Sequence, residues 1–194
     1  MKATLRITGG KKVRHRLYSL DISVVRPTPH IVREALGSIL RDRLPGARCL
    51  DLFAGTGAVG LEFLSRGASF CVFVEKLASA CRAIEQNLQK LDFKGSGWVL
   101  HSDVMSAIKR LGVRKMEFDI VFADPPYAYE LSSQMLRALR TSKLVHEDLV
   151  VIIERSKKER MDERYGQFVL TDVRRYGQTV LYFYELAREA GDEA

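Results

Sequence analysis

Short apolar segments alternate with longer segments of helical periodicity over most of the chain, and this alternation constrains the fold more than any other feature. In one helical segment, Leu77, Cys81, Ile84 and Leu88 recur three or four positions apart. The segments expected to form strands are 48–53, 69–75, 98–101, 118–123 and 149–154. Such alternation builds a mostly parallel sheet covered by helices on both faces. We therefore predict an α/β fold with its binding site at the carboxyl ends of the strands.

The C-terminal part of the chain has the pattern of an antiparallel strand pair. Segments 168–173 and 179–185 alternate around the turn Tyr176-Gly177. Residues from Ala187 onward are polar and acidic, as is typical of a flexible tail. We accordingly divide the chain into an N-terminal extension, a core domain and a tail, with the bounds 1–46, 47–186 and 187–194.

Positive charge is concentrated at the N-terminus. Residues 1–48 contain eleven Lys or Arg and three Asp or Glu, a net +8, whereas the whole chain carries +7, so the remainder carries −1. A local basic excess is expected where a protein binds phosphates. The basic residues that we predict to contact a nucleic acid here are Arg6, Lys11, Lys12, Arg14, Arg16 and Arg26.

The same extension contains signals for a hairpin and a helix. Segments 3–8 and 13–18 can pair around Gly9-Gly10, a strong turn signal. Thr28 can cap a helix that starts at Pro29, because proline suits the first helical position. That helix should end near Pro45-Gly46.

A glycine-rich turn follows the first core strand. Residues 55–60, Gly-Thr-Gly-Ala-Val-Gly, match the pattern GxGxxG, which lets a backbone approach a ligand closely. Asp51 precedes the turn by four residues; its carboxylate would repel a pyrophosphate but accept hydrogen bonds from a cationic amino group. Phe53 lies between them. This pattern favours S-adenosylmethionine, which has an amino group, a sulfonium and no phosphate.

Two further acids follow the next two strands. Glu75 ends the second strand about 20 residues after the turn, where a carboxylate can accept both hydroxyls of a ribose. Asp103 follows the third strand; it could accept from an adenine amino group, cap the next helix, or do both. With their neighbours Lys76 and Val104, these acids complete the predicted cofactor set, which includes Gly55, Gly57 and Asp124.

The sequence Asp124-Pro125-Pro126-Tyr127 after the fourth strand is the most specific motif. Two prolines fix the backbone and leave its carbonyls free to accept. Asp124 and the Pro125 carbonyl could each accept one hydrogen of an exocyclic base amine, which turns the nitrogen lone pair toward a methyl donor. Tyr127 offers a ring on which an extruded base can stack. We therefore predict that these four residues are catalytic.

These motifs resemble those of the class I methyltransferases with a [DN]PP[YF] turn, and more narrowly the RsmD family of bacterial ribosomal RNA methyltransferases. The narrower resemblance includes Arg6 to Lys11, Arg26-Pro27-Thr28, Arg33-Glu34 and Gly177-Gln178-Thr179. It implies a Rossmann-like, seven-stranded sheet whose last strand is antiparallel. It also implies methylation of a guanine N2 amine in 16S ribosomal RNA, with Arg26, Thr28 and Arg33 bordering the site, in a monomer.

Other functions remain open from the residues alone. The same chemistry could serve DNA adenine or cytosine amines, or a protein glutamine amide. GxGxxG with Glu75 also fits a nicotinamide-dependent oxidoreductase, and the basic extension fits a non-catalytic RNA-binding assembly factor. The three cysteines form no CxxC pair, so we expect buried, reduced thiols in a cytoplasmic protein without a metal site. The sequence also lacks an apolar run of the roughly 20 residues that a membrane span requires.

Overall fold

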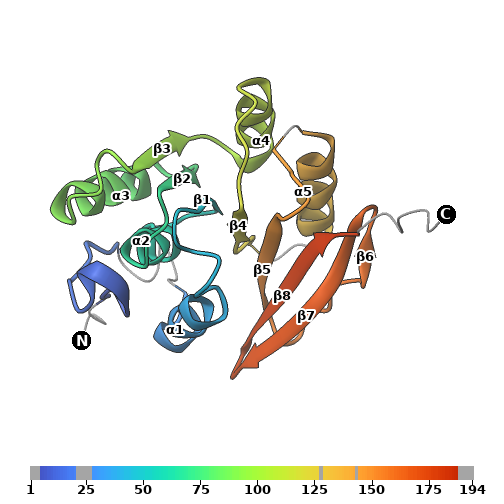
Figure 1. The fold of residues 1–194 in the computed structure, drawn as a ribbon, viewed down its shortest axis with the longest axis horizontal. Coiled ribbons are helices and arrows are strands. Elements are labelled where there is room, and N and C mark those ends of the chain that lie inside the picture. The colour runs from blue at the N-terminus through green and yellow to red at the C-terminus, as the bar shows by residue number, and fades with distance from the viewer. Residues whose placement is uncertain (1–4, 21–27, 127–128, 143, 188–194) are drawn as a thin grey trace.

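The computed structural model describes residues 5–20, 28–126, 129–142 and 144–187. These residues form an eight-stranded sheet in the order β3-β2-β1-β4-β5-β8-β7-β6, with helices on both faces (Figure 1). From β1 the chain proceeds outward to β3 and then returns to β4 on the other side of β1. The strand order thus reverses between β1 and β4. In open α/β sheets, ligands bind at the carboxyl ends of the strands at such a point.

The five predicted parallel strands are confirmed. They are β1 (Arg48–Leu52), β2 (Phe70–Glu75), β3 (Gly97–His101), β4 (Ile120–Ala123) and β5 (Val150–Ser156). Their registers bring the predicted site to one edge: Asp51 of β1 pairs with Phe122 of β4, and Glu75 of β2 pairs with His101 of β3. The acids at the strand ends therefore lie along one line across the sheet.

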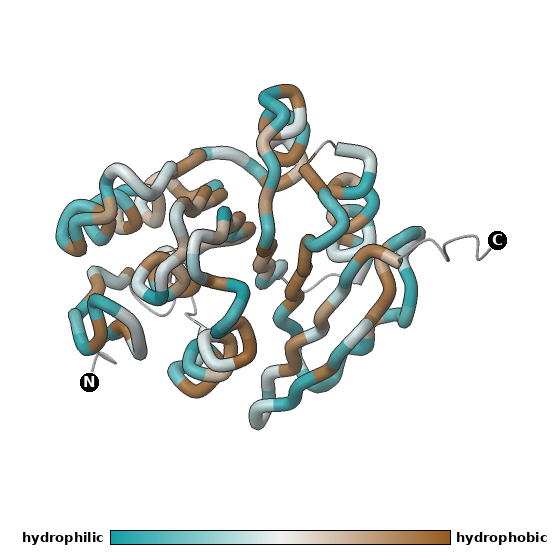
Figure 2. The backbone as a smooth tube through the Cα atoms, in the orientation of Figure 1, coloured by the Kyte–Doolittle hydropathy of each residue, from teal (hydrophilic) through white to brown (hydrophobic). Residues whose placement is uncertain are grey.

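Helices cover the two faces of the sheet unequally. They are α1 (His30–Ile39), α2 (Ala58–Ser65), α3 (Ala78–Lys90), α4 (Val104–Val113) and α5 (Tyr129–Thr141). α1, α2 and α3 pack with Cys49 and Phe73 in one core, whereas α4 and α5 pack with Leu50 and Val72 in the other. The side chains of successive strand residues point into opposite cores, which explains why the strands are apolar throughout. In Figure 2 the central strands are accordingly mostly hydrophobic.

The C-terminal pair is also confirmed, with one addition. β7 (Phe168–Tyr176) and β8 (Thr179–Leu186) are antiparallel, and β8 inserts between β5 and β7. A short strand, β6 (Arg164–Tyr165), pairs with β7 and raises the number of strands from the expected seven to eight. A strand of two residues is too short for an alternating pattern to indicate it.

The N-terminal extension forms a looser hairpin than expected. Arg6 and Arg16 form an isolated antiparallel bridge, and Leu17 donates its N–H to the Leu5 carbonyl at 2.9 Å. A 3₁₀ turn, η1 (Gly10–Lys12), connects the two sides in place of a tight two-residue turn. We call residues 5–17 the arm.

Two expectations for the first helix are wrong. Pro29 is the N-cap residue of α1, and no side chain caps the helix there; Thr28 is buried, and its carbonyl accepts from Arg33 Nε at 3.3 Å. α1 ends at Ile39, not near Pro45-Gly46. The apolar pattern continues beyond the helix because Leu40 and Leu44, in the following turns, are also buried in the core.

The three cysteines are buried free thiols, as predicted. No helix in the described part of the chain is long and apolar enough to cross a membrane.

Candidate active site

The glycine turn between β1 and α2 has a strained, compact backbone. Gly55 and Gly57 have positive φ angles of 56° and 76°, and Phe53 has a φ of 62°. Residues other than glycine rarely adopt that conformation, and they keep it only where the surrounding structure holds them in place. Gly60 lies where an added Cβ would contact the Phe73 ring and come within 2.7 Å of Cys71 Sγ. The third glycine therefore lets α2 pack closely on β2.

Asp51 is buried beneath this turn. Its side chain accepts the Gly60 N–H at 2.9 Å, and the residue is 2 % exposed. Burial raises the pKa of Asp51 to about 7; the Gly60 hydrogen bond opposes this shift, and the charges of Glu75 and Asp124 add to it. A cation bound beside Asp51 would stabilise its charged form.

Glu75 is positioned by backbone donors on either side. Its two carboxylate oxygens accept the N–H of Gly55 and the N–H of Leu77, both at 2.8 Å. Each oxygen keeps a lone pair that can accept a further hydrogen bond. The residue is 8 % exposed. Glu75 thus links the glycine turn to the end of β2 and can still accept hydroxyl donors.

Asp103 caps α4, one of its two predicted roles. It accepts the Ser106 N–H at 2.9 Å, which lowers the pKa of Asp103. The side chain is exposed, so the cap leaves acceptor capacity for a ligand. Lys76 is also exposed, and its carbonyl contacts His101 Nε2 at 3.0 Å, whereas Val104 is buried at the start of α4.

Two hollows meet at Asp124. The first, which we call the glycine hollow, contains residues of the glycine turn together with Thr28 and residues of α2 and β4; it is lined by Thr28, Asp51, Phe53, Ala54, Gly55, Thr56, Ala58, Val59, Phe122 and Asp124. The second, the proline hollow, is lined by Pro29, Asp124, Pro125, Pro126, Glu154, Arg155, Ser156, Glu159, Gln178 and Thr179. Asp124 can therefore contact groups in both. Tyr127 lies outside the described residues.

Arg155 is a site residue that the sequence did not reveal. Its guanidinium is nearly inaccessible, with its side chain 1 % exposed. Nη1 donates to the Pro125 carbonyl at 3.3 Å, and Nε lies 2.8 Å from a carboxylate oxygen of Glu159. The only signal was a run of charges directly after a buried strand. Glu154, the residue before it, is also buried and lines the same hollow.

The comparison with protein families agrees with this geometry. A family model described as conserved hypothetical protein 95 matches residues 5–185. The chain belongs to this family. It is the RsmD family that the sequence resembles, and its members include ribosomal RNA small subunit methyltransferase D of Escherichia coli K12. That protein is 30 % identical over 190 residues, which cover 98 % of this chain and 93 % of the relative.

Solved structures confirm the methyltransferase fold of this family member. The structure of yhhF from Escherichia coli has a TM-score of 0.83 at 26 % identity, over 96 % of this chain and 100 % of the other. The hypothetical protein TTHA0928 from Thermus thermophilus has a TM-score of 0.78 at 32 % identity, over 93 % and 99 % of the two chains. The sheet is therefore the Rossmann-like sheet of class I methyltransferases, as predicted.

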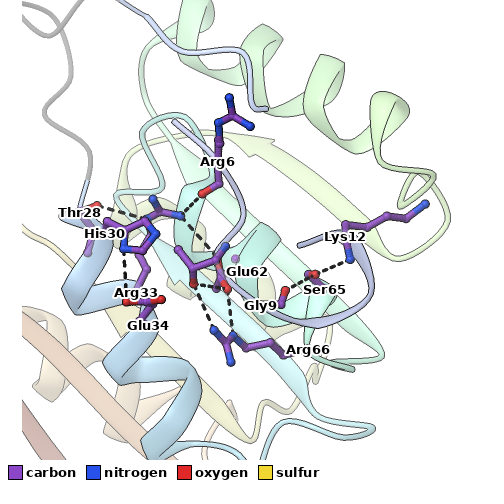
Figure 3. A network of polar contacts seen from close by, with 12 residues as sticks. Arg6, Gly9, Lys12, Thr28, His30, Arg33, Glu34, Glu62, Ser65 and Arg66 are labelled. Carbon is purple, nitrogen blue, oxygen red and sulfur yellow. Dashed lines mark hydrogen bonds and ion pairs between the residues drawn. The ribbon is translucent and has the colours of Figure 1, made fainter. Parts of the chain in front are cut away.

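In this RsmD-family chain the arm is fixed to the core by a buried carboxylate. Glu62 of α2, with its side chain 1 % exposed, accepts the Thr8 N–H at 2.9 Å and the Thr8 hydroxyl at 2.6 Å. Figure 3 shows Glu62 between Arg33 and Arg66. Glu62 also lies 2.9 Å from Arg66 Nε and 3.4 Å from Arg33 Nη1. Two guanidinium groups thus balance one buried charge, as burial requires.

Arg33 has a structural role in this network. It is 2 % exposed, and besides Glu62 it donates to the Arg6 carbonyl at 2.7 Å. These contacts place Arg33 inside the network rather than at the surface, and its expected place at the border of the site stays a prediction. Thr28, 7 % exposed, lines the glycine hollow.

Unlike Arg33, the basic residues of the arm lie at or near the surface. Lys12 is half-buried, with its Nζ 3.0 Å from Asp92 and above the Phe93 ring. Its backbone N–H donates to Ser65 Oγ at 2.9 Å, which holds the arm against α2. Arg26 lies outside the described residues. The exposed basic residues of the arm are Arg6, Lys11, Arg14 and Arg16.

Proposed function

We propose that this protein transfers a methyl group from S-adenosylmethionine to the exocyclic N2 amine of a guanine in small-subunit ribosomal RNA. The observation that carries the proposal is that Asp124 lines two hollows with different chemistry. One suits a cationic nucleoside, and the other is walled by the acceptors that an amine requires.

The glycine hollow suits S-adenosylmethionine better than a dinucleotide. Its described lining includes two carboxylates, Asp51 and Asp124, and neither Lys nor Arg. This arrangement disfavours a pyrophosphate and favours a ligand with an amino group and a sulfonium. Asp51 would bind the amino group, Glu75 the ribose hydroxyls and Asp103 the adenine amine. The nicotinamide-dependent oxidoreductase is therefore the weaker hypothesis.

The proline hollow can orient an amine for attack. When bound, S-adenosylmethionine supplies an electrophilic methyl group. Asp124 and the Pro125 carbonyl would each accept one amine hydrogen, so that the nitrogen lone pair points into the glycine hollow. Arg155 occupies one lone pair of the Pro125 carbonyl, and the other remains for the amine. Catalysis would come mainly from this positioning and from the Asp124 charge, which stabilises the cationic amine until its proton leaves.

The substrate assignment is supported by the relatives and by charge. The Escherichia coli relative is named a ribosomal RNA small subunit methyltransferase. The exposed arginines and lysine of the arm provide the positive charge that an RNA substrate needs. The target guanine would leave its stack to enter the proline hollow, as bases do in other base-modifying enzymes.

Transfer of labelled methyl groups tests the proposal. Unmethylated small subunits, naked small-subunit RNA and duplex DNA would each be offered, and the products digested to nucleosides. We expect label in N2-methylguanosine, a loss of about a thousandfold in Asp124→Ala, and a smaller loss in Asp124→Asn, which keeps an acceptor oxygen. Label confined to DNA adenine or cytosine would overturn the substrate assignment, and tight NAD binding without S-adenosylmethionine binding would overturn the reaction.

A further inference from the structure

We propose a second RNA-binding surface beside the proline hollow, at the end of the β7–β8 hairpin and across β4 from the arm. It consists of Lys157, Lys158, Arg160 and Arg175, which we call the tip cluster. The partner it fits is the phosphate backbone of the RNA strand that carries the target base. The inference rests on the proposed function and adds a specific binding surface to it.

The tip cluster adjoins the wall of the proline hollow. Lys157 donates its backbone N–H to the Gln178 carbonyl at 2.9 Å, which joins the loop after β5 to the turn between β7 and β8. Gln178 of that turn and Thr179, the first residue of β8, line the hollow that contains Asp124 and Pro125. A nucleotide whose base occupies the hollow would therefore have its backbone near Lys157.

The four basic residues come from two segments that pack together. Arg175 pairs with Val180 in the β7–β8 ladder, so both side chains lie on the face that contains Tyr182. Tyr182 donates its hydroxyl to the Glu159 carbonyl at 3.0 Å, which places the loop from Lys157 to Arg160 on that same face. Two charged segments far apart in the sequence thus become one surface.

The charge of this surface is not neutralised locally. Lys157, Lys158 and Arg175 are exposed and Arg160 is close to them in the loop, and none of the four forms an ion pair with another described residue. The acid within the loop already has a partner, because Glu159 lies 2.8 Å from Arg155. Asp172 pairs with Phe183 on the opposite face of the hairpin from Arg175 and lies 2.7 Å from Arg174. The almost neutral balance of residues 49–194 therefore conceals a local positive patch.

The arm and the tip cluster flank the site. The arm packs on α2, which lies over β1 and β2, whereas the hairpin of β7 and β8 lies beyond β5. Figure 1 shows the arm and the hairpin on either side of β4, whose carboxyl end leads to Asp124. An RNA strand with one base in the proline hollow extends both ways from it, so each basic surface can bind one flank.

The test compares two sets of three neutralised charges. The test variant is Lys157→Gln, Lys158→Gln and Arg175→Gln; the control is Arg41→Gln, Lys109→Gln and Lys115→Gln, all exposed and without ion pairs among described residues. The control residues lie away from the carboxyl ends of the strands, on or after α1 and α4. Binding of naked small-subunit RNA would be measured from low to moderate salt, with S-adenosylhomocysteine binding and thermal melting as checks of folding.

We expect the test variant to bind RNA about ten- to hundredfold more weakly near 0.1 M salt, with a salt slope smaller by roughly two to three. Binding of S-adenosylhomocysteine and the control variant should match the wild type. Equal weakening of RNA binding in both variants would show that only net charge matters and would overturn the proposal. Unchanged RNA binding in the test variant would also overturn it. In either case the proposed function stands if methyl transfer persists. A wild-type protein that binds no RNA would overturn this proposal, and it would overturn the proposed function as well if small subunits are not methylated.

Discussion

The two hollows that meet at Asp124 are built in different ways. Most of the lining of the glycine hollow comes from residues 51–59, whereas the proline hollow is assembled from the start of α1, the turn after β4, the end of β5 and the β7–β8 turn. The first is thus a local motif and the second a product of tertiary structure. A local motif can bind a cofactor that many enzymes share, whereas a hollow lined by distant segments can differ between enzymes that act on different substrates.

Their electrostatics differ as well. The glycine hollow contains buried acid without a basic side chain in its described lining, and the pKa of Asp51 is raised to about 7 as a result. The proline hollow contains an ion pair, Arg155 with Glu159, beside the carboxyl groups of Asp124 and Glu154. One hollow is therefore prepared to receive a cation, and the other is prepared to hold a rigid set of acceptors.

Replacing Arg155 should show whether the proline hollow depends on this pairing. In Arg155→Met the Pro125 carbonyl loses a donor and Glu159 loses its partner. We expect kcat to fall about a hundredfold, the equivalent of roughly 3 kcal/mol, because the acceptor that orients the amine is no longer fixed. Single-turnover kinetics would measure the effect.

The glycine hollow provides the control for that experiment. The affinity for S-adenosylhomocysteine should not change in Arg155→Met, and Arg155→Lys should recover part of kcat. A parallel loss of cofactor affinity and of the melting temperature would show that Arg155 only supports the fold.

A matched substitution on the cofactor side is Gly60→Ala. The added methyl group would press on the Phe73 ring and on Cys71 Sγ, which separates α2 from β2. We expect a loss of about 2 kcal/mol in unfolding free energy and weaker cofactor binding. Urea denaturation and calorimetry measure these quantities. Gly95→Ala is the control, because an added Cβ there meets nothing within 4 Å. Equal stability of the two variants would contradict the close packing.

The same division explains what the sequence could predict. The five parallel strands, the C-terminal strand pair and the positions of Asp51, Glu75 and Asp124 followed from periodicity and local motifs, because each depends on residues close together in the chain. Arg155 and Gln178 belong to the proline hollow only through the pairing of β5 with β8, which no local pattern specifies.

Arg33 illustrates a different limit. An arginine in a basic extension has the same sequence signature whether it faces RNA or a buried carboxylate. Its partner Glu62 lies 29 residues further along the chain, within an apolar helix. Only tertiary structure distinguishes these two roles.

The titration of Asp51 should make ligand binding in the glycine hollow depend on pH. Its pKa of about 7 lies above the ordinary value of 3.8, so the ligand-free protein loses stability as pH rises between these values. A bound cation favours the ionised form, so affinity for S-adenosylhomocysteine should increase about tenfold as pH rises through 7. Calorimetry across pH 6–8 would measure this. The Asp51→Asn variant should bind S-adenosylhomocysteine more weakly and without that increase. The ligand's own titration is common to both proteins. If the variant and the wild type show the same dependence of affinity on pH, Asp51 is not the group responsible.

The smallest effect is expected at Asp103, on the cofactor side of the site. Asp103→Ala removes the cap of α4, which costs about 1 kcal/mol, and removes the proposed acceptor for the adenine amine. Asp103→Ser separates these two roles, because serine caps a helix but cannot present a charged acceptor. We expect Ser to restore the melting temperature while leaving cofactor affinity a few-fold low. If Ser restores both, Asp103 serves the helix alone, and the cofactor side of the site ends at Glu75.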